Sequence, residues 1–230
     1  MTTNQRIMYN NNRFYNINNF WFPSVTSILK QLSEDGISRW KQRIGKEQAD
    51  KIIQYSTERG TRVHLYCELY LKNNYNMSFE VDLMENFNDV DINYFKNTFT
   101  SYLNNISNIK LLEGSLYSNK YKYAGTVDCI GEYDKQLSII DFKTSEKPKL
   151  FNYITSYFLQ TAAYSIAYEE ITGIKIDNLV IIIGVNSTME TQIFTENINN
   201  ICNLYNLSWK NTFLKLLENF NKLNSYPIHQ

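Results

Sequence analysis

The chain has 230 residues, with 23 basic and 23 acidic side chains and a formal net charge of zero. Hydrophobic residues make up 43% and charged residues 20%, which allows a sizeable core and argues against a disordered chain. Composition therefore does not indicate a strongly basic nucleic-acid-binding protein, although clustered carboxylates and surrounding basic residues can cancel in the sum.

Membrane and cysteine-based classes are also disfavoured. The longest apolar run, Leu179 to Val185 with one Gly, is too short to span a bilayer, and the N-terminus shows no signal-peptide pattern. The cysteines at 67, 129 and 202 form no CxxC or CxxH spacing, so neither a disulfide framework nor a zinc site is indicated. We expect a soluble, intracellular protein without a membrane partner. The Asn-, Lys-, Ile- and Tyr-rich composition suggests an AT-rich genome, in a bacterium or in a phage and its host cell.

The N-terminal part, residues 1–108, is predicted to be an arm followed by helices. Residues 1–20 are polar with scattered aromatic residues and indicate an arm or a short hairpin. Thr61 is a plausible N-cap, because it follows Arg59-Gly60 and precedes an apolar run. Apolar periodicity predicts helices over residues 27–32, 38–55, 61–72 and 91–105, with residues 73–90 as a solvated connection.

The C-terminal part, residues 109–230, changes to strand-like character. Short runs separated by turn signals predict strands over 110–117, 123–133 and 137–143. A helix over 156–171 is ended by Gly173, and the β-branched run 179–185 is typical of a buried strand. One amphipathic helix is predicted over 198–223. This order indicates an α/β core with an N-terminal helical region, in one compact unit.

Three charged side chains in the second and third strands form the central candidate site. Side chains alternate along a strand, so Asp141 and Lys143 share a face. If Lys135 and Gln136 form a two-residue loop, Asp128 lies opposite Lys143 and diagonal to Asp141 on that face. A slip of one residue in the register would move Asp128 to the other face.

These residue types suit hydrolysis of a phosphodiester by a divalent metal. Mg²⁺ or Mn²⁺ prefers hard carboxylate ligands, activates water and neutralises the phosphoryl oxygens, and a nearby lysine stabilises the transition state. A surface salt bridge on an ordinary hairpin explains the bare pattern of two aspartates and a lysine at least as well.

Four further residues add to the pattern, although each has an ordinary structural interpretation. His64 lies where its imidazole could reach a metal, Gln160 and Tyr164 share one helical face, and Glu113 supplies another carboxylate. Taken singly, a histidine in this position is more often structural. Gln160 and Tyr164 would then be only the polar edge of a helix, and Glu113 only a solvated charge.

Together, the motifs GTxxH, a glutamate, GTxD, DxK and QxxxY follow one another in an order that resembles the RecB-type branch of the PD-(D/E)xK nuclease superfamily. The segment from Phe22 to Leu29, Trp40 and the motif from Arg59 to His64 resemble the exonucleases of mitochondrial genome maintenance and their phage-type relatives. The resemblance covers roughly residues 20–185. It implies a restriction-endonuclease-like α/β core, with a mixed central sheet flanked by helices.

The resemblance also implies roles for single residues. His64, Asp128, Asp141 and the backbone carbonyl of Phe142 would bind the metal, and Lys143 would be the catalytic lysine with the two aspartates. The residues that would bind DNA or support the site are Glu113, Gln160 and Tyr164.

The implied function is a Mg²⁺- or Mn²⁺-dependent deoxyribonuclease that degrades DNA from strand ends in replication, repair or recombination, with single-stranded DNA as the expected substrate. A structure-specific endonuclease, a catalytically dead DNA-binding subunit and a ribonuclease are the alternatives. Iron–sulfur members of the branch use four cysteines, so no cluster is expected here. No GxxxxGK[ST] motif occurs, so no ATP-driven motor is expected.

Overall fold

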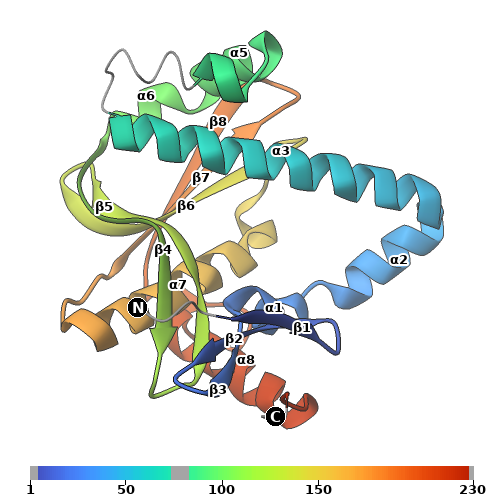
Figure 1. Cartoon of the computed structure of the whole chain (residues 1–230), viewed down its shortest axis with the longest axis vertical. Helices are drawn as coiled ribbons and strands as arrows, with labels where there is room; N and C mark the ends of the chain where they lie inside the picture. Colours follow the sequence, from blue (N-terminus) through green and yellow to red (C-terminus); the bar gives the residue numbers. More distant parts are fainter. Residues whose placement is uncertain (1–4, 74–82, 228–230) are drawn as a thin grey trace.

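The computed structural model describes residues 5–73 and 83–227 and is built around a five-stranded mixed sheet. The sheet has the order β4-β5-β6-β7-β8 (Figure 1). All neighbouring strands are antiparallel except β6 and β7. The strands are β4 (Ile106–Ser118), β5 (Tyr123–Tyr133), β6 (Gln136–Ser145), β7 (Asn178–Val185) and β8 (Glu190–Asn197).

Helix α7 (Thr155–Thr172) makes the crossover that the parallel pair β6–β7 requires. Its end at Gly173, which adopts a left-handed φ of 72°, confirms the stop expected from the sequence. Strand β7 is buried along nearly its whole length, because helices cover both faces of the sheet at this point. The α/β class with a mixed central sheet flanked by helices is thereby confirmed.

Two hydrophobic cores lie on opposite faces of this sheet. On one face, α1 (Val25–Lys30), α7 and α8 (Trp209–Leu223) contribute to one core. On the other face, α3 (Lys46–Asn73), α5 (Asp89–Thr98) and α6 (Thr100–Leu103) contribute to the second. The N-terminal helices therefore share a core with the sheet, while the division of the chain at residue 108 stays a prediction.

The expected N-terminal arm is a three-stranded antiparallel sheet of β1 (Arg6–Tyr9), β2 (Asn12–Ile17) and β3 (Phe20–Pro23). Asparagines with positive φ form both of its turns. Ser24 then caps α1 by accepting a hydrogen bond from the N–H of Ser27. The predicted hairpin was therefore one strand short.

The boundary between the first long helices was predicted at the wrong glycine. Helix α2 (Glu34–Ile44) ends at Gly45, whose φ of 86° and ψ of 149° suit glycine, and α3 then runs without a break through Gly60. Thr61 is not an N-cap, since its hydroxyl donates to the carbonyl of Thr57 within α3. A glycine between good helix formers on both sides is tolerated inside a helix, which explains the error.

Four smaller expectations also need correction. The helix expected over residues 91–105 is divided at Phe99 into α5 and α6. Residues 198–208 are not helical but contain the two-stranded pair β9 (Ile201–Cys202) and β10 (Leu207–Ser208). Strand β8 was not predicted, because its exposed and half-buried pattern lacks a clear apolar alternation. Of the solvated connection expected over residues 73–90, residues 74–82 lie outside the described residues. The described remainder corrects the expectation: residues 83–86 and 89–90 are helical, and Leu83 and Phe87 are buried in the second core.

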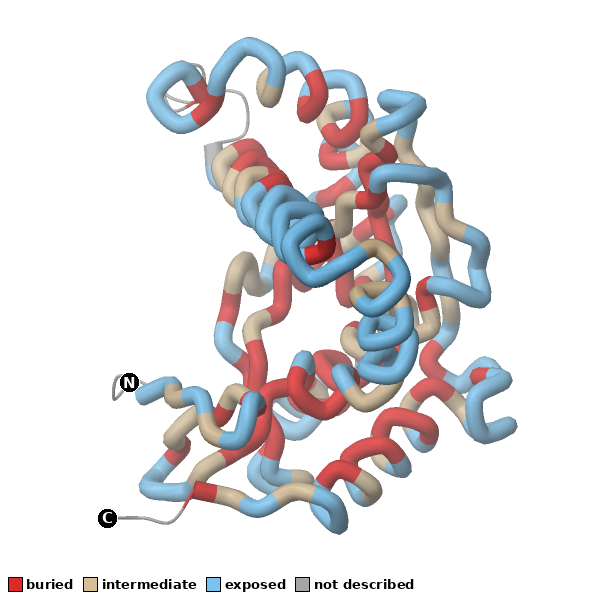
Figure 2. The backbone as a smooth tube through the Cα atoms, turned by 90° about the vertical axis from the view of Figure 1, so that its right-hand side faces the viewer, coloured by how far each residue is buried: buried red, intermediate tan, exposed pale blue. Residues whose placement is uncertain are grey.

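Helix α2 and the first half of α3 stand away from the two cores (Figure 1). No residue of α2 is buried, and between residues 46 and 58 only Ala49 is buried. Figure 2 shows this part of the tube almost wholly in the colour of exposed residues. We refer to residues 34–58 as the arch. No helix in the described part of the chain combines the length and apolarity that crossing a membrane requires.

Substitution of the two glycines tests the helix boundary. Gly45→Ala is expected to destabilise the fold by about 1–3 kcal/mol, because its backbone lies in a region that alanine adopts at a cost. Gly60→Ala is expected to stabilise the fold by roughly 0.5–1 kcal/mol, because the residue is helical and its added methyl meets no atom. The free energy of unfolding from urea titration measures both. Destabilisation by Gly60→Ala and none by Gly45→Ala would return the boundary to Gly60.

Candidate active site

Carboxylates from three adjacent strands meet at one point of the sheet. Leu112 pairs with Cys129 and Gly114 pairs with Val127, so Glu113 on β4 lies opposite Asp128 on β5. On the other side, Cys129 pairs with Ile140 of β6, and the position one step further brings Asp141 beside Asp128.

The hairpin that brings β5 and β6 together differs from the expected one. Its closing pair is Tyr133 with Gln136, and its two loop residues, Asp134 and Lys135, both have positive φ, as in a type I′ turn. The register is therefore shifted by two residues from the prediction, and Asp128 lies across from Asp141, not from Lys143. An even shift preserves the face of each side chain, so the predicted neighbours still meet.

The backbone ladder between β5 and β6 gives way to a side chain at Asp128. The last ladder pair is Cys129 with Ile140, and the next inward N–H, that of Phe142, donates to Oδ2 of Asp128 at 2.8 Å. Because the N–H and C=O of one strand residue point to the same edge, the carbonyl of Phe142 also lies on the side of Asp128. This side-chain bond fixes one oxygen of Asp128 and leaves Oδ1 for other partners.

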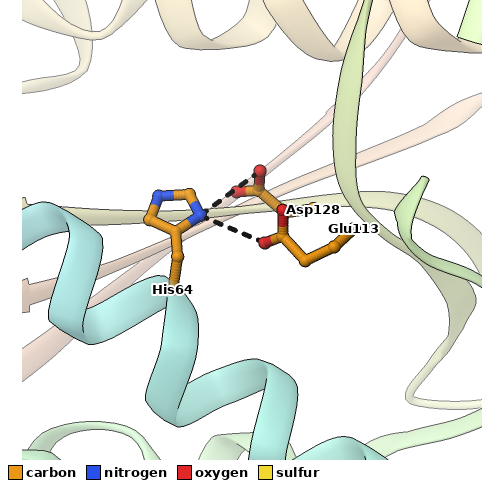
Figure 3. Close-up of side chains that lie close together, drawn as sticks. All are labelled: His64, Glu113 and Asp128. Carbon is orange, nitrogen blue, oxygen red and sulfur yellow. Dashed lines mark ion pairs between the residues drawn. The ribbon is translucent and has the colours of Figure 1, made fainter. Parts of the chain in front are cut away.

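His64 approaches these carboxylates from α3, as Figure 3 shows. Its Nδ1 lies 3.4 Å from Oδ1 of Asp128 and 3.4 Å from Oε1 of Glu113. One possible ligand atom from each of these three residues lies within 4.8 Å of the others. His64 sits next to the buried stripe of α3 that contains Val63 and Cys67, so packing of that stripe on the sheet sets the position of the imidazole.

Electrostatics favour positive charge in this cluster. Burial lowers the pKa of His64, but the charges and hydrogen bonds of Asp128 and Glu113 prevail and raise it to about 10. Burial raises the pKa of Asp128, but His64, Lys143 and the N–H of Phe142 prevail and hold it below its usual value.

Lys143 and Gln160 hold Asp141 from opposite sides. The ammonium group of Lys143 forms an ion pair with Oδ2 of Asp141. The side-chain amide of Gln160 donates to Oδ1 at 3.0 Å. The ring of Tyr157 lies beneath the lysine, with Nζ 5.3 Å from its centroid. Asp141 is only 1% exposed, so Oδ1 depends on the hydrogen bond from Gln160 and Oδ2 depends on the ion pair with Lys143.

Their titration follows from burial and proximity. Burial and the neighbouring Asp128 raise the pKa of Asp141 to about 7, against the opposing effect of Lys143. Burial lowers the pKa of Lys143, but Asp141 and Asp128 prevail and raise it, so the lysine is a cation at neutral pH.

Tyr164 is connected to the site through a side-chain hydrogen bond with Gln160. It is buried on α7, one turn after Gln160, and burial raises the pKa of its phenol. A Cβ on Gly125 would lie 2.8 Å from the tyrosine hydroxyl, so the glycine of the GTxD motif makes room for this ring.

Glu113 is held in an unusual backbone conformation. Its φ is 45° in the interior of β4, a region that costs a residue other than glycine about 1–3 kcal/mol. The strain turns the carboxylate toward His64, and strained residues of this kind cluster at functional sites. From the sequence Glu113 is only one more carboxylate, whereas in the structure it lies within the cluster of His64 and Asp128.

The donor set fits a divalent cation. Carboxylate oxygens suit Mg²⁺ and Mn²⁺, and an imidazole is a common ligand of transition metals. Among the described residues, the possible ligands are Glu113, Asp128 and His64, with Asp141 next to Asp128. The charges of Asp128 and Glu113 that raise the pKa of His64 would favour a cation at the same place.

One aromatic and one basic residue near the site were not identified as candidates from the sequence. Tyr157 lies three residues before Gln160 and seven before Tyr164, so the spacing of one helical face could have identified it. Arg59 of the motif before His64 is buried and lines a cavity together with Tyr157.

A mixed sheet that gathers carboxylates from three strands, with a lysine and a histidine beside them, defines an α/β protein with a candidate metal centre. No family model matches the chain. The chain is 32% identical over 153 residues to mitochondrial genome maintenance exonuclease 1 of Xenopus tropicalis, which covers 62% of this chain and 42% of that protein. It is likewise 32% identical over 157 residues to the human protein of that name, with the same shares of 62% and 42%. The mouse protein is 31% identical over 135 residues, covering 55% of this chain and 38% of the relative.

The chain thus spans about two fifths of the length of the curated relatives that it matches. The resemblance to mitochondrial genome maintenance exonucleases that the motifs indicated is confirmed. The assignment to the RecB-type branch of the PD-(D/E)xK superfamily stays a prediction, as do the roles of the individual site residues.

A thermal-shift experiment tests whether the cluster holds a metal. Mn²⁺ or Mg²⁺ at about 100 times its dissociation constant is expected to raise the melting temperature by on the order of 5–10 °C, because the ion binds the folded state. Asp128→Asn should abolish most of this gain. Glu218→Gln, an exposed carboxylate substitution on α8, should retain it. An equal gain in the Asp128→Asn variant would place the bound ion elsewhere.

Proposed function

We propose that this chain is a divalent-metal-dependent deoxyribonuclease that hydrolyses DNA from strand ends, with a preference for single strands. The observation that supports this function most directly is the convergence of Asp128, Asp141 and Lys143 with His64 and Glu113 at one point of the sheet. The similarity to proteins named as exonucleases adds independent support. Assignment to the RecB-type PD-(D/E)xK branch is part of the proposal.

In this proposal the metal ligands are His64, Asp128, Asp141 and the carbonyl of Phe142, with Glu113 at hand for a second ion or for the substrate. Mg²⁺ or Mn²⁺, when bound, polarises the phosphoryl group and lowers the pKa of a coordinated water. The hydrogen bond from the N–H of Phe142 keeps Asp128 in a fixed orientation, and that from Gln160 does the same for Asp141.

Lys143 is the residue that we expect to act on the reacting groups. Its ammonium group is held by Asp141 and lies over the ring of Tyr157, so it has a defined position at the edge of the carboxylates. From there it can donate a hydrogen bond to the attacking water and stabilise negative charge on the phosphoryl oxygens. Tyr164 lies against Gly125 and supports this arrangement through its hydrogen bond with Gln160.

The arch supports a requirement for a free end. The second half of α3 covers the sheet through Val63, Tyr66 and Tyr70, whereas the arch itself covers no core. It also exposes four large apolar residues, which are Ile37, Ile52, Ile53 and Tyr55. A strand passing between the arch and the sheet would explain both features, since unstacked bases offer apolar faces to such side chains. The work of such an enzyme would lie in replication, repair or recombination.

The competing functions differ in what they require of the site. A structure-specific endonuclease would use the same metal chemistry without a free end. A DNA-binding subunit without catalysis would have no need for Lys143 to be paired with Asp141 beside the cluster. A ribonuclease would share the metal chemistry and differ in its contacts to the 2′-hydroxyl.

Matched substitutions test the chemistry. Asp141→Asn and Lys143→Gln are each expected to lower the rate of DNA cleavage roughly a hundredfold to a thousandfold, because each removes a charge from the reacting centre. The double variant should be little slower than either single one, since the two residues act as a unit. Cleavage of an end-labelled single-stranded oligonucleotide with Mn²⁺ measures these rates.

The hairpin turn supplies controls of the same chemical type. Asp134→Asn and Lys135→Gln change exposed residues of the same two-stranded unit and should leave the rate unchanged. Melting temperatures show whether each variant is folded. Wild-type rates in folded Asp141→Asn or Lys143→Gln protein would remove the proposed site.

A circular substrate tests the need for an end. A covalently closed single-stranded DNA circle should stay intact, while the same molecule cut once should be degraded progressively, because only the cut form can be threaded beneath the arch. Both forms have the same sequence and charge, so non-specific binding cannot separate them. Rapid nicking of the closed circle would favour the endonuclease and leave the metal chemistry untouched.

A further inference from the structure

A cavity of about 670 Å³ lies beside the candidate active site, between α3 and the segment that follows β6. Arg59 of α3 forms one wall of the cavity. The other lining residues include Thr144 at the end of β6, Lys147 and Lys149 in the loop that follows, and Tyr153 and Tyr157 near the start of α7. None of them is a proposed metal ligand, although Tyr157 also contacts Lys143.

The cavity adjoins the reacting centre directly. Thr144 follows Lys143 in β6, and Tyr157 lines the cavity while its ring lies beneath the ammonium group of Lys143. On α3, Arg59 precedes His64 by five residues, which is about 7.5 Å along the helix axis. A chain molecule whose reacting phosphate lies at the carboxylates can therefore place its neighbouring unit in this cavity.

The charge of the lining favours an anion. Three of its side chains are basic, namely Arg59, Lys147 and Lys149, and one is acidic, Glu146. Arg59 is unusual among them, because its side chain is only 7% exposed and Nη1 donates to Oε2 of Glu146 at 2.9 Å. Its Nε is also buried and has no hydrogen-bond partner among the described residues.

The loop that forms the other wall is held in place by hydrogen bonds. The hydroxyl of Ser145 donates to the carbonyl of Lys147, and Gln192 of β8 bonds to both the N–H and the C=O of Lys149. The side chain of Asn186 donates to the same carboxylate of Glu146 that Arg59 contacts. The cavity is therefore formed before any ligand binds, which lowers the cost of binding.

We propose that this cavity binds the nucleotide unit next to the scissile bond, with its backbone phosphate on Arg59 and its base against Tyr153. The proposal deepens the nuclease function proposed above and rests on it. A guanidinium group matches the geometry of phosphate oxygens and remains charged when buried, and the two lysines add attraction from the rim. Tyr153 is 71% exposed at the mouth of the cavity and offers a ring face on which a base can stack.

Opposite effects of two substitutions on one ion pair test the phosphate site. Binding of a short fluorescent single-stranded oligonucleotide is measured by anisotropy in Ca²⁺, which is larger than Mg²⁺ and coordinates more loosely, so that turnover is suppressed. Arg59→Gln should weaken binding about tenfold or more, because a charge-assisted hydrogen bond to phosphate is lost. Glu146→Gln should bind equally well or more tightly, because it removes negative charge from the cavity.

If Arg59 served only to pair with Glu146, the two variants would change affinity in the same direction, and the proposal would be wrong. Arg59→Lys, which keeps the charge, should bind more tightly than Arg59→Gln and covers the case in which the glutamine variant folds poorly. Lys222→Gln on the exposed face of α8 is the control for general charge and should bind as wild type does.

The dependence on salt separates the phosphate contact from the base contact. Arg59→Gln should reduce the slope of log affinity against log salt by about 0.7, the value for one phosphate of a single strand. Tyr153→Ala should weaken binding without changing that slope, since stacking releases no counterions. Oligonucleotides with and without terminal phosphates then show which phosphate is bound. Equal effects of Arg59→Gln on both indicate the internal backbone, as proposed, and an effect confined to the phosphorylated end contradicts that part.

The result is distinguishable from failure of the nuclease function itself. If wild-type protein cleaves DNA and depends on Asp141 and Lys143, but Arg59→Gln binds with unchanged affinity and slope, the cavity proposal alone is wrong. If wild-type protein neither binds nor cleaves DNA in Mn²⁺, the proposed function fails and the cavity proposal fails with it.

Discussion

The hydrogen bond from the N–H of Phe142 to Asp128 is the interaction on which the site depends. A carboxylate that is 5% exposed costs several kcal/mol unless it is paired, so Asp128 must be satisfied from within the protein. The backbone of β6 supplies one donor, and the ladder between β5 and β6 gives way at that point. The other oxygen turns to His64, so the same carboxylate connects the sheet with α3.

The packing of helix α3 on the sheet sets the positions of the site residues that the helix carries. The buried stripe of this helix packs on the sheet through Val63, and the phenols of Tyr66 and Tyr70 bond to Thr100 and Asn104 at the two ends of α6. Because side chains repeat every 3.6 residues along a helix, that register also sets where His64 and Arg59 point. A slip of α3 by one residue would carry both side chains away from the strands, so the packing of the second half of the helix determines where they lie.

The order and type of most central elements could be predicted, because apolar periodicity and glycine or proline signals act locally. The three strands and α7 with its end at Gly173 are of this kind. The helix boundary could not, since both Gly45 and Gly60 are plausible stops, and only the backbone conformation of Gly45 decides between them. The non-helical segment before α8 was missed for a related reason: the paired strands β9 and β10 that it contains are only two residues long each and show no apolar alternation.

The site shows the same division between local and long-range information. The shared face of Asp141 and Lys143 follows from the strand period alone. The position of Asp128 on the same face also held, although the turn was predicted one residue too late, because the resulting register error was even. The position of Glu113 depends instead on a positive φ inside β4, which no motif announces. Tyr157 and Arg59 reach the site from α7 and α3, so their roles became visible only when the packing of those helices was known.

Rigidity is distributed in a way that suits a chain-like substrate. The carboxylates sit on central strands, and Lys143 and Asp141 are held by neighbours on β6 and α7, so the reacting groups have little freedom to move. The arch has few buried apolar contacts, which places it at the low-stability end of the molecule. Contacts between the arch and a bound strand would then add favourable binding free energy, offset in part by the entropy that the arch loses, while the central strands keep their geometry. In the proposed function, binding of a long substrate and the chemistry would therefore involve different parts of one helix, because α3 lies outside the cores over its first half and packs on the sheet over its second.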